Sequence, residues 1–206
     1  MIDHLVFATR DIDATVDRVA DRLGVRPTPG GRHPGLGTRN ALVDLGAGAY
    51  LEIIGVDASA AGPPDGPRPF GLDRITEPRL ATWAVKAPGL DERVARARAA
   101  GYDPGPVQPM SRRRPDGTEL RWRLTAPGAD AVEVVPFLIE WADGAPHPST
   151  TAAHGCRLVG LTGEHPDPAA VAPLLSALEV DLVVQSATAA ALVAVIEGPA
   201  GMMELR

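Results

Sequence analysis

One order of secondary structure returns along this chain, and this internal repeat constrains the fold more than any other feature of the sequence. From His4 the sequence reads as a strand, a turn and an amphipathic helix, followed by a Gly/Pro-rich loop. Two β-like runs come next, NALVDLG and AYLEIIGVD. One face of the helix is formed by Ile12, Val16, Val19 and Leu23, with Asp11 as N-cap and Gly24 as the stop. With a short strand at 25–28, residues 1–56 are predicted to form a βαβββ module.

The same order returns over residues 80–139. Aligning Val94 with Val16 places Thr82 at the position of His4 without a gap. The runs LRWRLTAP and AVEVVPFLI are predicted to be strands, and the second places Glu133 at the position of Glu52.

A third copy is expected over residues 156–206. In it Arg157 and Glu204 take the positions of His4 and Glu52, and we expect an ion pair between them. This copy has no partner within the chain. We therefore expect it to pack against the first two modules or to pair with its equivalent in a homodimer. Residues 57–79 and 140–155 are predicted to be linkers, since they are rich in small residues, Pro and Gly.

Composition excludes several classes of partner. The net charge is −6 and aromatic residues make up 4% of the chain, which argues against nucleic acid as a partner. No apolar run is long enough for a membrane span, and no signal peptide precedes the first strand, so we expect a cytoplasmic protein without a membrane partner. Cys156 is the single cysteine, which rules out an intramolecular disulfide and a multi-cysteine metal site.

The repeated modules, with His4 on a first strand and Glu52 in YLEIIG on a fourth, resemble the vicinal-oxygen-chelate superfamily. That superfamily includes lactoylglutathione lyases, extradiol dioxygenases, epimerases and antibiotic-binding resistance proteins. The segments HPGLGTRN and PFLIEWADGAPHPS are similar to those of its glyoxalase-like branch. The resemblance implies an α+β fold, in which repeated βαβββ modules form a cup-shaped mixed sheet with helices on the outer face. It also implies that residues 1–139 form a glyoxalase-like domain.

The resemblance further implies a metal site made of His4, Glu52 and Glu133. Side chains alternate along a strand, so His4 faces the cup while Leu5 and Phe7 point toward the helix. One imidazole and two carboxylates suit one divalent ion such as manganese, iron, nickel or zinc. Thr82 departs from the expected ligand pattern. The alternative is a buried His4 whose hydrogen-bond partner is Glu52, with no metal.

Other residues are candidates for catalysis or substrate binding. Glu52 is the candidate proton-transfer base, and His33 is either a general base or a substrate-binding group. Asn40 is a candidate donor to a substrate carbonyl, and Arg121 and Arg123 are candidates to clamp an anionic substrate. The alternatives are a turn histidine, an asparagine that satisfies backbone, and arginines on a solvated outer face. We expect residues 112–114, three arginines, to lie in a solvated loop, and His147 either to close one end of the cup or to shape a proline turn.

Two functions remain open. The first is a glyoxalase-like enzyme that carries out lyase or isomerase chemistry on a small oxygenated metabolite, with a divalent metal as Lewis acid. The second is a non-catalytic protein that sequesters a small molecule without a metal, as resistance-type members do. Thr82, where a ligand is expected, is the feature that favours the second.

Overall fold

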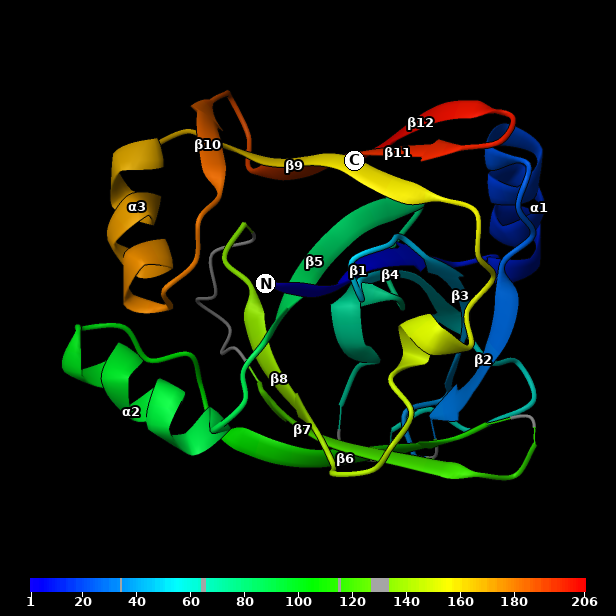
Figure 1. Cartoon of the computed structure of the whole chain (residues 1–206), viewed down its shortest axis with the longest axis horizontal. Coiled ribbons are helices and arrows are strands. Elements are labelled where there is room, and N and C mark those ends of the chain that lie inside the picture. Colours follow the sequence, from blue (N-terminus) through cyan, green and yellow to red (C-terminus); the bar gives the residue numbers. More distant parts are fainter. Residues whose placement is uncertain (34, 64–65, 115, 127–133) are drawn as a thin grey trace.

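The computed structural model describes residues 1–33, 35–63, 66–114, 116–126 and 134–206, and they form two sheets with three α-helices (Figure 1). The first sheet contains β1 (Ile2–Thr9), β2 (Thr28–His33), β3 (Thr38–Asp44), β4 (Tyr50–Val56), β5 (Arg79–Lys86), β6 (Val107–Arg113), β7 (Glu119–Thr125) and β8 (Phe137–Trp141). The second contains β9 (Arg157–His165), β10 (Val183–Ser186), β11 (Ala191–Gly198) and β12 (Gly201–Leu205). The helices are α1 (Ile12–Leu23), α2 (Leu90–Ala99) and α3 (Pro168–Ala177), and two short 3₁₀ segments span Pro69–Gly71 and Pro148–Thr150.

The first sheet is a closed barrel built from two equivalent halves. Its strand order is β1-β4-β3-β2-β6-β7-β8-β5, so the first half, β1-β4-β3-β2, has the same order as the second, β5-β8-β7-β6. The halves join through antiparallel pairing of β1 with β5 and again where β2 meets β6. The predicted α+β cup of repeated βαβββ modules is confirmed, and the second junction closes the cup into a barrel.

Strand alternation separates an outer apolar layer from the barrel interior. Leu5, Phe7 and Leu51 pack in one cluster with the buried face of α1, as predicted for the helix side. Val6 and Ile54 instead belong to an inner cluster that includes Trp122 from the second half. The inner faces of the two halves therefore meet, and His4 and Glu52 share that side of their strands.

The start and end of α1 follow the predicted signals. The Asp11 side chain accepts a hydrogen bond from the backbone N–H of Ala14, and Gly24 ends the helix with φ of 73°. No helix in the described ranges is long and apolar enough to cross a membrane.

Two strands have different bounds from those predicted. The second strand spans Thr28–His33 rather than 25–28, so part of the expected Gly/Pro-rich loop is strand. Of the strand predicted over 131–139, residues 131–133 lie outside the described residues, and the described strand begins at Phe137. Pro136 explains this boundary, because a proline has no N–H to donate to a sheet ladder.

The third module repeats the order of elements but not the topology. Its strands run β10-β9-β11-β12, with β9 parallel to β10, whereas in the barrel a first strand pairs with a fourth. Consequently Arg157 and Glu204 do not meet, and the predicted ion pair between them is wrong. Arg157 pairs with Glu197, while Glu204 pairs with Arg206. The module packs its buried residues, such as Leu192 and Ile196, into the outer apolar layer of the barrel.

Both linkers supply buried side chains. Leu72 and Ile75, from the first linker, join the inner cluster. Ala152, from the second, packs with Leu42 and Tyr50. The linkers therefore complete the interior of the barrel.

Truncating Leu72 tests whether the first linker is part of the core. Its side chain is 1% exposed, so Leu72→Ala should lower the free energy of unfolding by about 2–5 kcal/mol. Val183→Ala is the control, because Val183 is 66% exposed and its truncation should change stability by less than about 0.5 kcal/mol. Urea denaturation measures both, and equal effects would show that the linker does not contribute to the core.

Candidate functional site

The barrel interior holds a cluster of four polar residues predicted from the sequence: His4, His33, Asn40 and Glu52. All four are buried. The Nδ2 of Asn40 donates a hydrogen bond to Oε1 of Glu52. The Nε2 atom of His4 lies 3.8 Å from Oε2 of Glu52, and Nε2 of His33 lies 3.9 Å from Oε1. Both separations are too long for a hydrogen bond, so each imidazole faces the carboxylate without bonding to it. We refer to these residues as the inner polar cluster.

His4 is held by contacts on two sides of its ring. Its Nδ1 lies 2.7 Å from Oδ1 of Asp3. The ring stacks on Tyr50, with centroids 4.8 Å apart and planes inclined by 21°. These contacts leave Nε2 directed toward Glu52.

His33 belongs to the same cluster through β2. Its Nδ1 lies 3.0 Å from Oγ1 of Thr38, and its ring meets Trp122 edge-on at 6.3 Å. Burial lowers the pKa of His33, and the opposing effect of the Glu52 carboxylate does not reverse this. His33 is therefore a neutral imidazole at neutral pH.

Asn40 packs against Gly30. The absent side chain of this glycine leaves the room that the Asn40 amide occupies. A Cβ at Gly30 would collide with Oδ1 of Asn40 and lie 2.9 Å from Cγ of Leu42. Among the described atoms, Oδ1 of Asn40 is buried and has no hydrogen-bond partner. Unpaired buried acceptors are uncommon and costly, and this one packs against the backbone of Gly30.

Arg112 is a component of the site that the sequence interpretation missed. It is buried on β6 rather than solvated in a loop, and its Nη1 donates to the carbonyl of Gly30. Burial lowers the pKa of Arg112, whereas Tyr50 and Glu52 raise it. The side-chain alternation of Met110 and Arg112 on a strand would have indicated an inward arginine, had the strand been predicted.

Asp3 was not predicted as a site residue, and His147 was expected either to close one end of the cup or to shape a proline turn. Both support His4. Asp3 accepts hydrogen bonds from Trp141 at 3.1 Å and from Nε2 of His147 at 3.0 Å. Burial raises the pKa of Asp3, but hydrogen bonds from His147 and His4 outweigh this effect and hold it well below its usual range. Asp3 is therefore an ionised carboxylate under His4.

The second half of the barrel does not repeat the ligand positions of the first. Val6 pairs with Glu52 across β1 and β4, and the equivalent pair across β5 and β8 is Ala84 with Phe137. Phe137 therefore takes the position that the sequence alignment assigned to Glu133. Glu133 itself lies outside the described residues.

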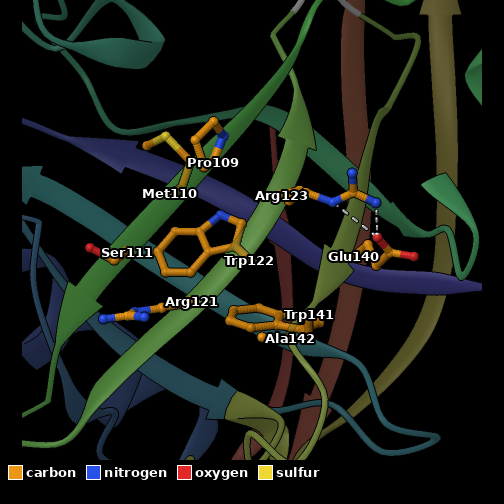
Figure 2. A pocket seen from close by; sticks show the side chains of 9 residues that line it. All are labelled: Pro109, Met110, Ser111, Arg121, Trp122, Arg123, Glu140, Trp141 and Ala142. Carbon is orange, nitrogen blue, oxygen red and sulfur yellow. Dashed lines mark hydrogen bonds and ion pairs between the residues drawn. The ribbon is translucent and has the colours of Figure 1, made fainter. Parts of the chain in front are cut away.

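Arg121 and Arg123 are not part of the inner polar cluster. Arg121 is exposed and pairs with Glu119, and Arg123 pairs with Asp91 and Glu140. They line a surface cavity of about 450 Å³ across β6, β7 and β8, together with Trp122 and Trp141 (Figure 2). A second cavity of about 780 Å³ is lined by residues including Met1, Lys86 and Arg93. The linings of these two cavities do not include the inner polar cluster.

Residues 2–179 match the sequence profile of a family described as Glyoxalase-like domain. The chain belongs to the glyoxalase-like domain family. The resemblance to the glyoxalase-like branch of the vicinal-oxygen-chelate superfamily is thereby confirmed. None of the proteins with curated descriptions matches this glyoxalase-like chain.

Solved structures resemble this glyoxalase-like protein to different degrees. A hypothetical protein from Staphylococcus aureus superposes with a TM-score of 0.66 at 13% identity, over 98% of this chain and 84% of that chain. Methylmalonyl-CoA epimerase from Mycobacterium tuberculosis gives 0.47 at 23% identity, over 68% and 87%. A Streptomyces coelicolor methylmalonyl-CoA epimerase variant in complex with 2-nitronate-propionyl-CoA gives 0.47 at 23%, over 71% and 98%. At these identities the likeness to the Staphylococcus protein concerns the fold alone, and the two epimerase scores are too low to carry over any property.

Members of the superfamily commonly bind a divalent metal, but the donors described in this chain do not fit one. Of the four equivalent positions, Phe137 has no donor atom and Thr82 offers only a hydroxyl. Ligand bonds of about 2.0–2.2 Å at tetrahedral angles set neighbouring donors about 3.3–3.6 Å apart. The imidazoles lie 3.8 and 3.9 Å from Glu52. Within the described part of the chain, no group of three or more His, Cys, Asp or Glu side chains could hold a metal ion.

An alanine at position 30 should disturb the site and the fold together. The added Cβ would push Asn40 away from β2, so Gly30→Ala should lower the free energy of unfolding by about 1–3 kcal/mol. Gly160→Ala is the matched control, because no described atom lies within 4 Å of its added Cβ. Equal unfolding midpoints for the two variants in urea would contradict the packing of Asn40 against Gly30.

Proposed function

We propose that this glyoxalase-like protein is an enzyme that moves a proton at the carbon beside a carbonyl group of a small oxygenated metabolite. This is isomerase or lyase chemistry, and the inner polar cluster is the proposed site. The observation that carries the proposal is the buried Glu52 carboxylate, whose two oxygens face the Nε2 atoms of His4 and His33 at 3.8 and 3.9 Å.

Glu52 is the proposed base. Its Oε1 accepts a hydrogen bond from Asn40, while Oε2 has no hydrogen bond to the described residues and faces His4. A carboxylate with one oxygen held and one available can take a proton from a bound carbon acid. The C–H electron pair then becomes the carbon–carbon double bond of an enolate, and the carbonyl oxygen takes the negative charge.

The electrostatics of the interior support this transfer. Before the step, the Glu52 carboxylate carries the negative charge near the Arg112 guanidinium. Afterwards Glu52 is neutral and the charge lies on the substrate oxygen. Arg112 would stabilise that oxygen, and the total charge of the site would not change. The proposed substrate is therefore uncharged at its reacting end.

The imidazoles suit a second proton transfer. Isomerisation of a hydroxy carbonyl compound moves one proton between carbons and another between oxygens. Glu52 would carry the first. The Nε2 of His4 faces the Glu52 carboxylate and would accept the proton of the substrate hydroxyl. His33, a neutral imidazole, would hold a substrate oxygen, and Asn40 would hold the Glu52 carboxylate through its hydrogen bond to Oε1.

Deuterium exchange tests the proposed chemistry without knowledge of the natural substrate. The protein is incubated in D₂O with dihydroxyacetone, hydroxyacetone or glyceraldehyde, and proton NMR follows loss of the α-proton signals. We expect protein-dependent exchange with at least one of the three. Glu52→Gln, which removes the base, should slow exchange by about 10²- to 10⁴-fold.

Glu204→Gln provides the control, because Glu204 is an exposed carboxylate in the second sheet. The Glu204→Gln variant should catalyse deuterium exchange of the substrate at the wild-type rate. An absence of protein-dependent exchange with all three compounds would contradict the enzyme and favour the sequestering protein.

We further propose that the reaction proceeds without a resident divalent ion, because the described donors do not fit one. Elemental analysis of purified protein should find manganese, iron, nickel and zinc each at well under one equivalent per chain. A stoichiometric ion that disappears in Glu52→Gln would instead establish the metal-assisted enzyme predicted from the sequence.

A further inference from the structure

We propose that Asp3 is the positioning residue that sets the orientation and the tautomer of His4 for proton transfer. The inference rests on the proposed function, in which Nε2 of His4 accepts a proton. Asp3 does not touch the proposed substrate and would act only through His4.

A β-bulge turns Asp3 toward His4. The register of β1 against β5 shifts between Ile2 and His4. With strict alternation Asp3 would share the helix side of the strand with Leu5. Instead Asp3 and His4 are both buried, at 0% and 4% exposure, and their side chains bond to each other. Bulges commonly re-aim a side chain near a functional site.

The hydrogen bonds of Asp3 leave it little freedom. Oδ2 accepts from the indole N–H of Trp141 on β8 and from Nε2 of His147 in the second linker. The backbone N–H of Ser149 donates to Nδ1 of His147, so His147 carries a proton on Nε2, which it donates to Asp3. The other carboxylate oxygen of Asp3, Oδ1, bonds to Nδ1 of His4. Asp3 thus joins β1, β8 and the linker in one network.

This network determines the state of His4. An ionised carboxylate can only accept a hydrogen bond, so Nδ1 of His4 must carry the proton that it donates to Asp3. In the neutral ring Nε2 then has the lone pair, and it faces Glu52 at 3.8 Å. That is the tautomer that the proposed second proton transfer requires.

Asp3→Asn tests the inference by replacing one carboxylate oxygen of Asp3 with an amide NH₂ group. The indole of Trp141 is an obligate donor, so the amide oxygen of Asn must face it and the amide NH₂ must face His4. Nδ1 of His4 would then accept a hydrogen bond from this NH₂ group, and the ring proton of the neutral imidazole would lie on Nε2. Nitrogen-15 NMR of histidine-labelled protein should show a protonated Nδ1 in the wild type and a protonated Nε2 in Asp3→Asn. The interconversion of dihydroxyacetone and glyceraldehyde, the reaction in which His4 would carry the hydroxyl proton, should slow by about 10²-fold or more.

Asp44→Asn is the matched control, since Asp44 accepts from His154 at 2.9 Å in a pair whose histidine side chain is 65% exposed. Asp44→Asn should alter neither the His4 signals nor the rate of dihydroxyacetone–glyceraldehyde interconversion. A wild-type His4 protonated on Nε2 overturns the inference even if Asp3→Asn does not fold. An unchanged tautomer in a folded Asp3→Asn overturns it as well, and so does a changed tautomer with an unchanged rate of dihydroxyacetone–glyceraldehyde interconversion. The tautomer needs no substrate, so the inference can fail or hold independently of the proposed function.

Discussion

Strand β1 is the element on which the rest of the structure depends. It pairs in parallel with β4 within its own half of the barrel and antiparallel with β5 of the other half. Its apolar Leu5 and Phe7 pack on the outer layer, and His4 and Val6 lie on the inner side. One strand therefore joins the two modules, anchors the helices and presents an imidazole to the interior. A register slip of one residue would exchange these faces.

The interior combines charge with an apolar surround, and that combination supports the proposed chemistry. Asp3, Glu52 and Arg112 are all buried. A buried charge is destabilising unless it is paired or hydrogen-bonded. Asp3 meets this requirement with three donors, whereas Glu52 has a bond to Asn40 and lies near Arg112. Groups retained in such an environment interact strongly with a ligand, because little water screens them.

Much of the fold was predictable from the sequence, and about half of the candidate site. The spacing in α1, the cap at Asp11 and the alternation around His4 depend on neighbours along the chain, and each agrees with the structure. The inner polar cluster was predicted residue by residue because its members lie on strands of one module or beside them. Arg112 and Asp3 were missed for two reasons. A strand rich in arginine and proline has no apolar alternation to reveal it, and a bulge leaves no sequence signal.

The sequence by itself determined the two βαβββ modules, their inner and outer faces and the family, because periodicity and local caps are properties of short segments. Tertiary structure decided which residues meet. Only the pairing of β5 with β8 places Phe137, rather than Glu133, opposite Ala84. Only the path of the linkers brings His147 to Asp3 and Leu72 into the core. The pairing of the third module also differs from that of the barrel, although its elements follow the same order. Strand pairing and linker paths depend on contacts between residues far apart in the chain, so no local pattern encodes them.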